Sequence, residues 1–129
     1  MGARHQKYLD MLCDVAETVE PVARQRMAAA VVLKNHVISV GINKRKTHPV
    51  QQKYSKHKEA IWLHAEIDAI IGALRHISPE ELSQCTMYVA RVKRPDDNPN
   101  VFVEGLAKPC EGCQHALEQF GIKKVYYTK

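Results

Sequence analysis

Apolar side chains recur every three or four residues near the start of the chain, at Tyr8, Leu12, Val15 and Val19. This spacing places them on one face of a helix, so the pattern predicts an amphipathic helix over residues 5–20. Pro21 cannot continue a helix and is expected to close this segment.

Four runs rich in β-branched and apolar residues are short enough to be strands. The first two, 28–33 and 36–42, are separated only by Lys34-Asn35, and they predict a β-hairpin. The other two lie further along the chain, at 85–92 and 122–127. We expect these to be the third and the last strand.

Three segments with helical character lie between and after these strands. Residues 60–74 are apolar on nearly every side, as expected of a helix buried between other elements. Residues 78–81, Ser-Pro-Glu-Glu, fit a capping box with proline in the first turn, which predicts a short helix. Residues 111–120 carry apolar side chains on one helical face, and Gly121 is expected to end this helix.

Two polar stretches interrupt this pattern and are expected to be loops. Residues 43–58 contain Pro49 and several cations, and residues 93–108 contain proline, asparagine, aspartate and glycine. Strands that alternate with helices predict one sheet covered by helices, which is an α/β fold. A length of 129 residues is typical of a single domain, so we expect one domain over 1–129.

The overall composition is that of an ordinary globular protein. Apolar residues make up 45% of the chain and charged residues 26%, which excludes a disordered or collagen-like chain. No apolar stretch approaches the ~20 residues of a membrane span, and residues 1–20 lack the apolar core of a signal peptide. These features predict a cytoplasmic protein without membrane contact, whose four cysteines are free thiols or metal ligands rather than disulfides.

The positive charge is concentrated in one segment. The chain carries 19 Lys plus Arg against 14 Asp plus Glu, which gives a net charge of +5. Residues 44–58 contribute +6, with no acid among them, through Lys44, Arg45, Lys46, Lys53, Lys56 and Lys58. Since 5 − 6 = −1, the rest of the chain is nearly neutral. The segment is either a solvated loop or a binding surface for an anionic partner.

Two short motifs contain side chains that bind metals. His64-Ala65-Glu66 opens the buried helix, and Cys110 and Cys113 open the last helix. Two thiolates three residues apart at a helix start can bind one Zn²⁺, and one imidazole completes a three-ligand set. Three protein ligands leave the fourth position for water, which is typical of a catalytic zinc site. Glu66 can serve this site only if it shares the first helical turn with His64 and the metal lies beyond the helix end.

Other interpretations of these residues stay open at this stage. The two cysteines could belong to a structural zinc site that Cys85 or His115 completes, with Glu66 idle. His64 could be an ordinary buried histidine, and Glu66 an ordinary first-turn acid. Asp68, four residues past His64, could support the site or pair with a nearby cation.

The two motifs, in this order of predicted elements, resemble the zinc-dependent cytidine/deoxycytidylate deaminase superfamily, which includes tRNA adenosine deaminases. The resemblance covers most of the chain and implies a three-layer α/β/α fold with a mixed central sheet. It implies that His64, Cys110 and Cys113 hold Zn²⁺ and that Glu66 moves protons between water and the base. Relatives are commonly dimers or larger, which implies a homo-oligomer.

The same resemblance implies contacts with the substrate. The backbone N–H of Ala65 would help fix the edge of the base. Asn43 follows the second strand and matches a position where relatives use asparagine to bind the sugar. The other interpretation of Asn43 is a turn residue shortly after Gly41.

The place of the basic segment in the chain favours a phosphorylated substrate. It begins directly after Asn43 and ends shortly before His64, so Lys44, Arg45 and Lys46 are candidate phosphate ligands. We therefore expect a hydrolytic deaminase of a cytosine nucleotide or nucleoside, with dCMP favoured. The alternative is a deaminase of nucleic acid, such as a tRNA adenosine deaminase, because the same cations could follow a phosphate backbone. A third interpretation, of another class, is a non-catalytic zinc-stabilised binding module.

Overall fold

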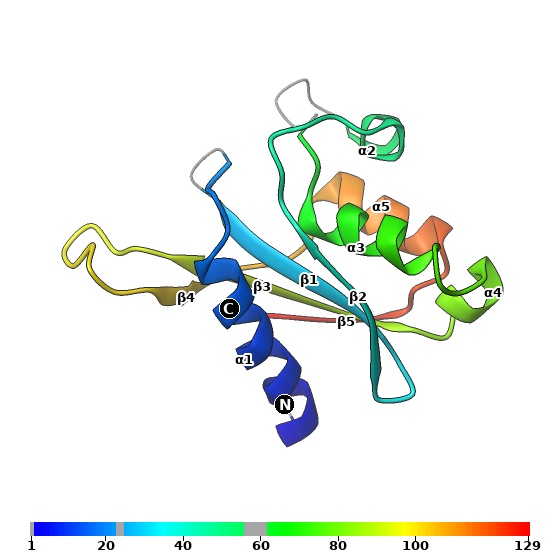
Figure 1. The fold of residues 1–129 in the computed structure, drawn as a ribbon, viewed down its shortest axis with the longest axis horizontal. Coiled ribbons are helices and arrows are strands. Elements are labelled where there is room, and N and C mark those ends of the chain that lie inside the picture. Colours follow the sequence, from blue (N-terminus) through cyan, green and yellow to red (C-terminus); the bar gives the residue numbers. More distant parts are fainter. Residues whose placement is uncertain (1, 23–24, 56–61) are drawn as a thin grey trace.

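The computed structural model describes residues 2–22, 25–55 and 62–129. The elements are, in chain order, α1 (Ala3–Glu17), β1 (Arg26–Leu33), β2 (His36–Ile42), α2 (Pro49–Tyr54), α3 (Ala65–Ala73), α4 (Pro79–Leu82), β3 (Thr86–Lys93), β4 (Val103–Gly105), α5 (Glu111–Gln119) and β5 (Lys124–Tyr127). Figure 1 shows a central sheet with α1 on one side and α3 and α5 on the other. The predicted three-layer α/β/α fold is confirmed.

Strands β1 and β3 form the centre of a mixed sheet. β1 pairs antiparallel with β2 on one side and with β3 on the other. Two strands share the far edge of β3. Its first half pairs with β5 in parallel, and its last three residues pair antiparallel with β4. The parallel pair requires a crossover, and α5 lies in it.

Both faces of β1 are buried, which explains its nearly continuous apolar sequence. Ala29 and Val31 pack in the core on the α3 side, whereas Ala30 and Val32 pack with α1. On β2, a Cβ at Gly41 would lie 2.3 Å from a backbone nitrogen of α3. This glycine therefore allows α3 to pack directly against the sheet, and α3 carries the first metal-binding motif.

Two turns form as their sequences predict. Lys34 and Asn35 connect β1 and β2 with φ angles of 48° and 67°, which is the conformation of a two-residue type I′ hairpin turn. Before α4, the Ser78 hydroxyl accepts a hydrogen bond from the Glu81 N–H, and the Glu81 carboxylate accepts one from the Ser78 N–H. The predicted capping box is therefore present.

The two segments expected to be loops both contain secondary structure, which corrects that prediction. Residues 49–54 form α2, and the His48 side chain caps this helix by accepting from the Val50 N–H. Residues 103–105 form β4. Both elements are too short to show a clear periodicity, and packing or pairing with distant segments stabilises them. Residues 56–58 of the first segment, with two of its six cations, lie outside the described residues.

The buried helix is shorter than predicted. Residues 60 and 61 lie outside the described residues, residues 62–64 are not helical, and α3 begins at Ala65. His64 is the N-cap residue, with φ −82° and ψ 154°. This start places Glu66 in the first turn, two residues after His64, as a shared metal site requires. The last strand begins at Lys124 rather than at residue 122, because the Ile122 N–H donates to Leu117 O at the end of α5 and not to the sheet.

The helices of this fold are short. Across residues 2–22, 25–55 and 62–129, none combines the length and apolar character that crossing a membrane requires. The cytoplasmic location stays a prediction.

Candidate active site

His64 stands at the start of α3, and its side chain is not used to cap that helix. Its backbone N–H donates to Gln51 Oε1 over 3.0 Å. The preceding residue, Leu63, exchanges two backbone hydrogen bonds with the segment after β2. Lys44 N–H donates to Leu63 O, and Leu63 N–H donates to Lys46 O, each over 2.9 Å. These bonds fix the chain at His64 and at the residue before it, and they bring the basic segment beside the site.

Cys110 and Cys113 open α5. Cys110 is the N-cap residue, and its Sγ accepts from the Cys113 N–H over 3.5 Å. The turn before it is held by Gln114, whose Nε2 donates to Pro109 O over 2.9 Å. Cys110 is exposed, whereas Cys113 is fully buried. One thiol therefore lies at the rim of the site and the other at its floor.

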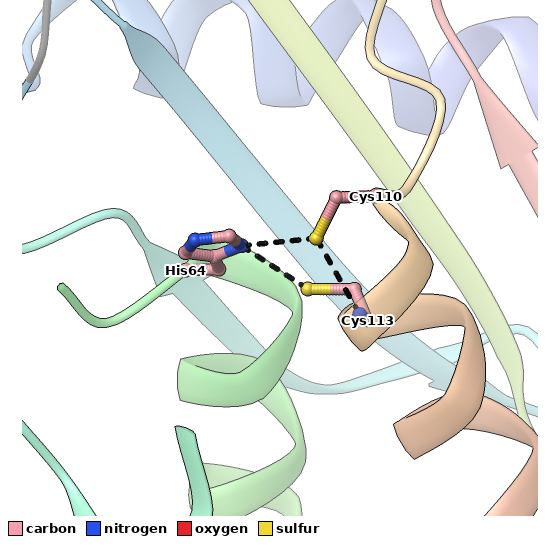
Figure 2. Close-up of side chains that lie close together, drawn as sticks. All are labelled: His64, Cys110 and Cys113. Atoms are coloured by element: carbon pink, nitrogen blue, oxygen red, sulfur yellow. Dashed lines mark hydrogen bonds between the residues drawn. The ribbon is translucent and has the colours of Figure 1, made fainter. Parts of the chain in front are cut away.

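Figure 2 shows the imidazole of His64 facing both thiols. His64 Nδ1 lies 3.2 Å from Cys113 Sγ and 3.6 Å from Cys110 Sγ. The three ligand atoms lie within 4.8 Å of one another, and no other group of three such residues forms in the described part of the chain. One nitrogen and two sulfur donors fit Zn²⁺ and leave one coordination position open.

The two thiols differ in pKa because they share a hydrogen bond. Donation by the Cys113 thiol, supported by a bond from His64, lowers the pKa of Cys110 to about 4. The same bond, together with burial, raises the pKa of Cys113. The contact with Cys110 also raises the pKa of His64. The three groups thus share protons that a metal ion would displace, since metal ligands must be deprotonated.

Glu66 adds a buried carboxyl group to this cluster. Its side chain is 2% exposed, and burial raises its pKa. A hydrogen bond from its own backbone N–H opposes this shift most, followed by the charge of His64 and a contact with the Cys113 thiol. Oε1 has no hydrogen-bond partner among the described residues, whereas buried polar atoms are nearly always bonded. An open carboxyl oxygen beside three metal-binding atoms fits a site that takes a metal, water and a substrate.

The residues proposed to complete a closed structural zinc site lie elsewhere. Cys85 donates to Glu81 O over 3.4 Å and belongs to the core under α3. His115 packs edge-on against the ring of Tyr54. Among residues 2–22, 25–55 and 62–129, the cluster therefore keeps three protein ligands.

The cations that follow β2 have different surroundings. Lys44 Nζ forms an ion pair with Asp68 at 3.1 Å, and Asp68 also accepts from the Ile42 N–H over 3.0 Å. Of the two interpretations of Asp68, the structure therefore shows the pairing with a nearby cation. Arg45 and Lys46 are exposed at the edge of the segment that bridges to the residue before His64.

Asn43 is buried, with 8% of its surface exposed, and its amide binds the start of β1. Oδ1 accepts from the Met27 N–H and Nδ2 donates to Gln25 O, both over 2.9 Å. Among the described residues, these two bonds leave the amide one N–H and one lone pair. Asn43 also lines a cavity of about 300 Å³ between residues 19–22 and 42–45. Ala65 is fully buried in the first turn of α3.

Gln51 is a residue of the site that the sequence did not reveal. It is 1% exposed and lies on α2. Its carboxamide accepts from His64 N–H and donates to Ser55 Oγ, each over 3.0 Å. A glutamine in a polar, lysine-rich stretch resembles a surface residue, so its burial follows only from the fold.

The sheet, the His-Cys-Cys cluster and the buried carboxyl define a zinc-binding α/β protein. The model of the family described as "Cytidine and deoxycytidylate deaminase zinc-binding region" matches residues 3–129. The chain belongs to this family. The predicted family is confirmed, and the family together with the cluster assigns Zn²⁺ as the cofactor.

Two solved structures of dCMP deaminase from the cyanophage S-TIM5 have a similar fold. The apo form is 21% identical with a TM-score of 0.63, covering 98% of this chain and 84% of that chain. The complex with dCMP and dUMP is 18% identical with a TM-score of 0.63, covering 98% of this chain and 82% of that chain. A comparison with curated protein sequences finds no match. The two similar structures thus support the α/β fold.

Proposed function

We propose that the protein is a zinc-dependent hydrolytic deaminase that converts a cytosine nucleotide or nucleoside to the uracil form, with dCMP as the favoured substrate. The observation that carries this proposal is the open, buried Glu66 carboxyl beside His64, Cys110 and Cys113. Membership of the cytidine and deoxycytidylate deaminase family supports it. So does the cyanophage dCMP deaminase of similar fold, whose structure was solved with dCMP and dUMP.

In this proposal His64, Cys110 and Cys113 would hold Zn²⁺, which would supply a Lewis acid that lowers the pKa of water. Glu66 accepts a proton from water and delivers it to the ring nitrogen of the base. It then helps to protonate the departing exocyclic amine. One water is consumed and one ammonia is released, so cytosine becomes uracil without an oxidant. The raised pKa of Glu66 favours this role, because the carboxyl must take up and return a proton at each turnover.

The basic segment supports a phosphorylated substrate. Arg45 and Lys46 are exposed on the segment that bridges to the residue before His64, where they can bind phosphate oxygens. The charge of Lys44 is balanced by its ion pair with Asp68, so Lys44 would have to exchange this partner for a phosphate oxygen. The N–H and lone pair that Asn43 keeps suit a sugar hydroxyl, and the Ala65 N–H suits the edge of the base.

A substrate panel tests the proposal directly. The zinc-loaded protein is incubated with cytosine and adenine nucleosides, their nucleotides and a tRNA pool, and ammonia release is measured. We expect the fastest release from dCMP. Release from tRNA alone would favour the nucleic-acid deaminase, and no release from any member would leave the zinc-stabilised binding module. Light scattering on the same sample tests the expected homo-oligomer.

A further inference from the structure

Helix α2 contacts both of the segments that carry the metal ligands. Its apolar side chains, the buried Tyr54 and the partly buried Val50, share one apolar cluster with Ile67 of α3 and with Cys113 and Ala116 of α5. In Figure 1, α2 lies at the end of the molecule where α3 and α5 begin. This short helix therefore packs against both segments that carry the metal-binding motifs.

On the α3 side, the contact is made by Gln51. Its Oε1 accepts from the backbone N–H of His64, and its Nε2 donates to Ser55 Oγ at the end of α2. With the side chain 1% exposed, water has little access to these two bonds. The His64 N–H precedes the first turn of α3, so no helical hydrogen bond could take the place of Gln51.

On the α5 side, the contact is made by the backbone at the end of α2. Gly112 lies between the two cysteine ligands, and a Cβ there would come within 2.4 Å of Tyr54 O. The ring of Tyr54 packs against His115 and Phe120 further along α5. The same six-residue helix is thus fixed to the Cys110–Cys113 turn at one end and to His64 through Gln51.

We infer that Gln51 is a positioning residue for the zinc site, through which α2 sets the distance between His64 and the two cysteines. This inference rests on the zinc site of the proposed function and deepens it. Gln51 does not touch the metal-binding atoms. It holds the backbone from which the imidazole projects, as outer contacts of metal ligands do in other sites.

Cobalt and zinc binding test this role without any nucleotide. The metal-free protein is titrated with Co²⁺, and the thiolate-to-metal and ligand-field bands report the geometry of the site. Competition with Zn²⁺ at a fixed pH then gives the zinc affinity. We expect Gln51→Leu to weaken zinc binding by about 10- to 100-fold and to alter the cobalt spectrum.

The neighbouring residue provides a matched control. Gln52 lies on the same helix but is exposed, so Gln52→Leu should bind both metals as the unmodified protein does. Gln51→Glu keeps an acceptor oxygen for the His64 N–H and should stay within about threefold of the original affinity. Gln51→Asn is one methylene shorter and should follow Gln51→Leu, which keeps the test available if the leucine variant does not fold.

Equal zinc affinity and equal cobalt spectra for the Gln51 and Gln52 variants would overturn the inference. So would a lower melting temperature of the metal-free Gln51 variants with no change in zinc affinity, because that result defines a purely structural role. If the protein binds zinc but deaminates no substrate, the proposed function is contradicted. The zinc affinities of the variants can still be measured and still test the role of Gln51.

Discussion

Each face of the sheet holds a histidine among buried groups, but the two clusters differ in how their polar atoms are used. On the α1 face, His5 Nδ1 lies 2.6 Å from the Tyr88 hydroxyl, and the His5 ring stacks on Tyr126 at 3.9 Å. On the α3 face, His64 Nδ1 faces two thiols, and Glu66 Oε1 is buried with no partner in the described part of the chain. In the first cluster the ring nitrogen and the tyrosine hydroxyl are thus paired with each other, whereas the second cluster keeps a carboxyl oxygen left unpaired by the described residues.

This difference shows that partners, rather than residue types, separate a structural cluster from a functional one. On the α1 face the Tyr8 hydroxyl also has a partner, the Asn35 carbonyl. Within the described residues, two buried side-chain atoms lack one, Glu66 Oε1 and Arg91 Nε. Strand alternation from Val89 places Arg91 on the α3 face as well. Both open atoms thus belong to the side of the sheet that carries the metal ligands.

Of the changes considered, Glu66→Gln should have the largest effect, because it alters the unpaired carboxyl group on the α3 face. Glutamine has nearly the same shape but cannot carry a proton, so we expect kcat to fall by about 10²- to 10⁴-fold. Zinc content, measured by atomic absorption, should not change, because Glu66 is not a ligand in the proposed site. The unfolding midpoint should stay equal or rise, since a buried carboxyl is replaced by a neutral amide.

The control for this variant is Glu104→Gln. Glu104 is exposed on β4, where it contacts Cys13 of α1, away from the zinc cluster. Its neutralisation should leave turnover unchanged. Full activity of Glu66→Gln, with its zinc retained, would remove the proton-transfer role that the proposal gives to this residue.

The rates at which the cysteines on the two faces react with an alkylating reagent should also differ, by a smaller factor than the loss of kcat in Glu66→Gln. In the metal-free protein, the pKa of Cys110 is about 4, whereas burial raises the pKa of Cys13 on α1 to about 12. Cys110 is therefore a thiolate at neutral pH and is exposed, so it should react with iodoacetamide tens of times faster. Peptide mass spectrometry reads out both sites.

Zinc adds a second comparison to the same experiment. Loading with Zn²⁺ should protect Cys110, since its sulfur would be coordinated, and should leave the slow rate at Cys13 unchanged. If zinc slowed the reaction of both cysteines equally, or slowed neither reaction, a metal site confined to the α3 face would be contradicted.

The sequence predicted those parts of the fold that repeat a period or use a local turn. Residues 36–42 were predicted with the observed bounds, and the Lys34-Asn35 turn needs only two adjacent residues in left-handed conformation. The metal-binding cluster could also be predicted from the sequence, because Cys110 and Cys113 lie one helical turn apart. Their partner His64 was identified by its neighbour Glu66, although the helix was predicted to begin earlier than Ala65.

What the sequence did not predict depends on contacts between distant segments. Helix α2 has six residues, and its buried Gln51 has no apolar character that would mark it as interior. Strand β4 has three residues and exists through its register with the end of β3. The pairing of Lys44 with Asp68 was one of two interpretations, and only the placement of α3 against β2 decided between them.

A double substitution in the basic segment tests whether the α3 face also binds the phosphate of the substrate. Arg45→Gln with Lys46→Gln removes two exposed cations and leaves the ion pair of Lys44 with Asp68 intact. We expect KM for dCMP to rise about three- to tenfold and KM for deoxycytidine to change little, because exposed charge contacts are individually weak. Steady-state kinetics on both substrates measures the difference, and an equal rise for both would remove these residues from phosphate binding.

On the α1 face, Tyr88→Phe should have the smallest effect and none on turnover. The substitution removes the hydroxyl that pairs with His5 Nδ1 and leaves the stacked rings in place. We expect the free energy of unfolding to fall by about 1 kcal/mol, as for the loss of one partly buried hydrogen bond, with kcat and KM unchanged. Urea unfolding and kinetics on the same preparation provide both values. If Tyr88→Phe lowered kcat by tenfold or more without a loss of stability, the α1 face would take part in function, and the distinction between a cluster with paired polar atoms and one with an unpaired carboxyl oxygen would fail.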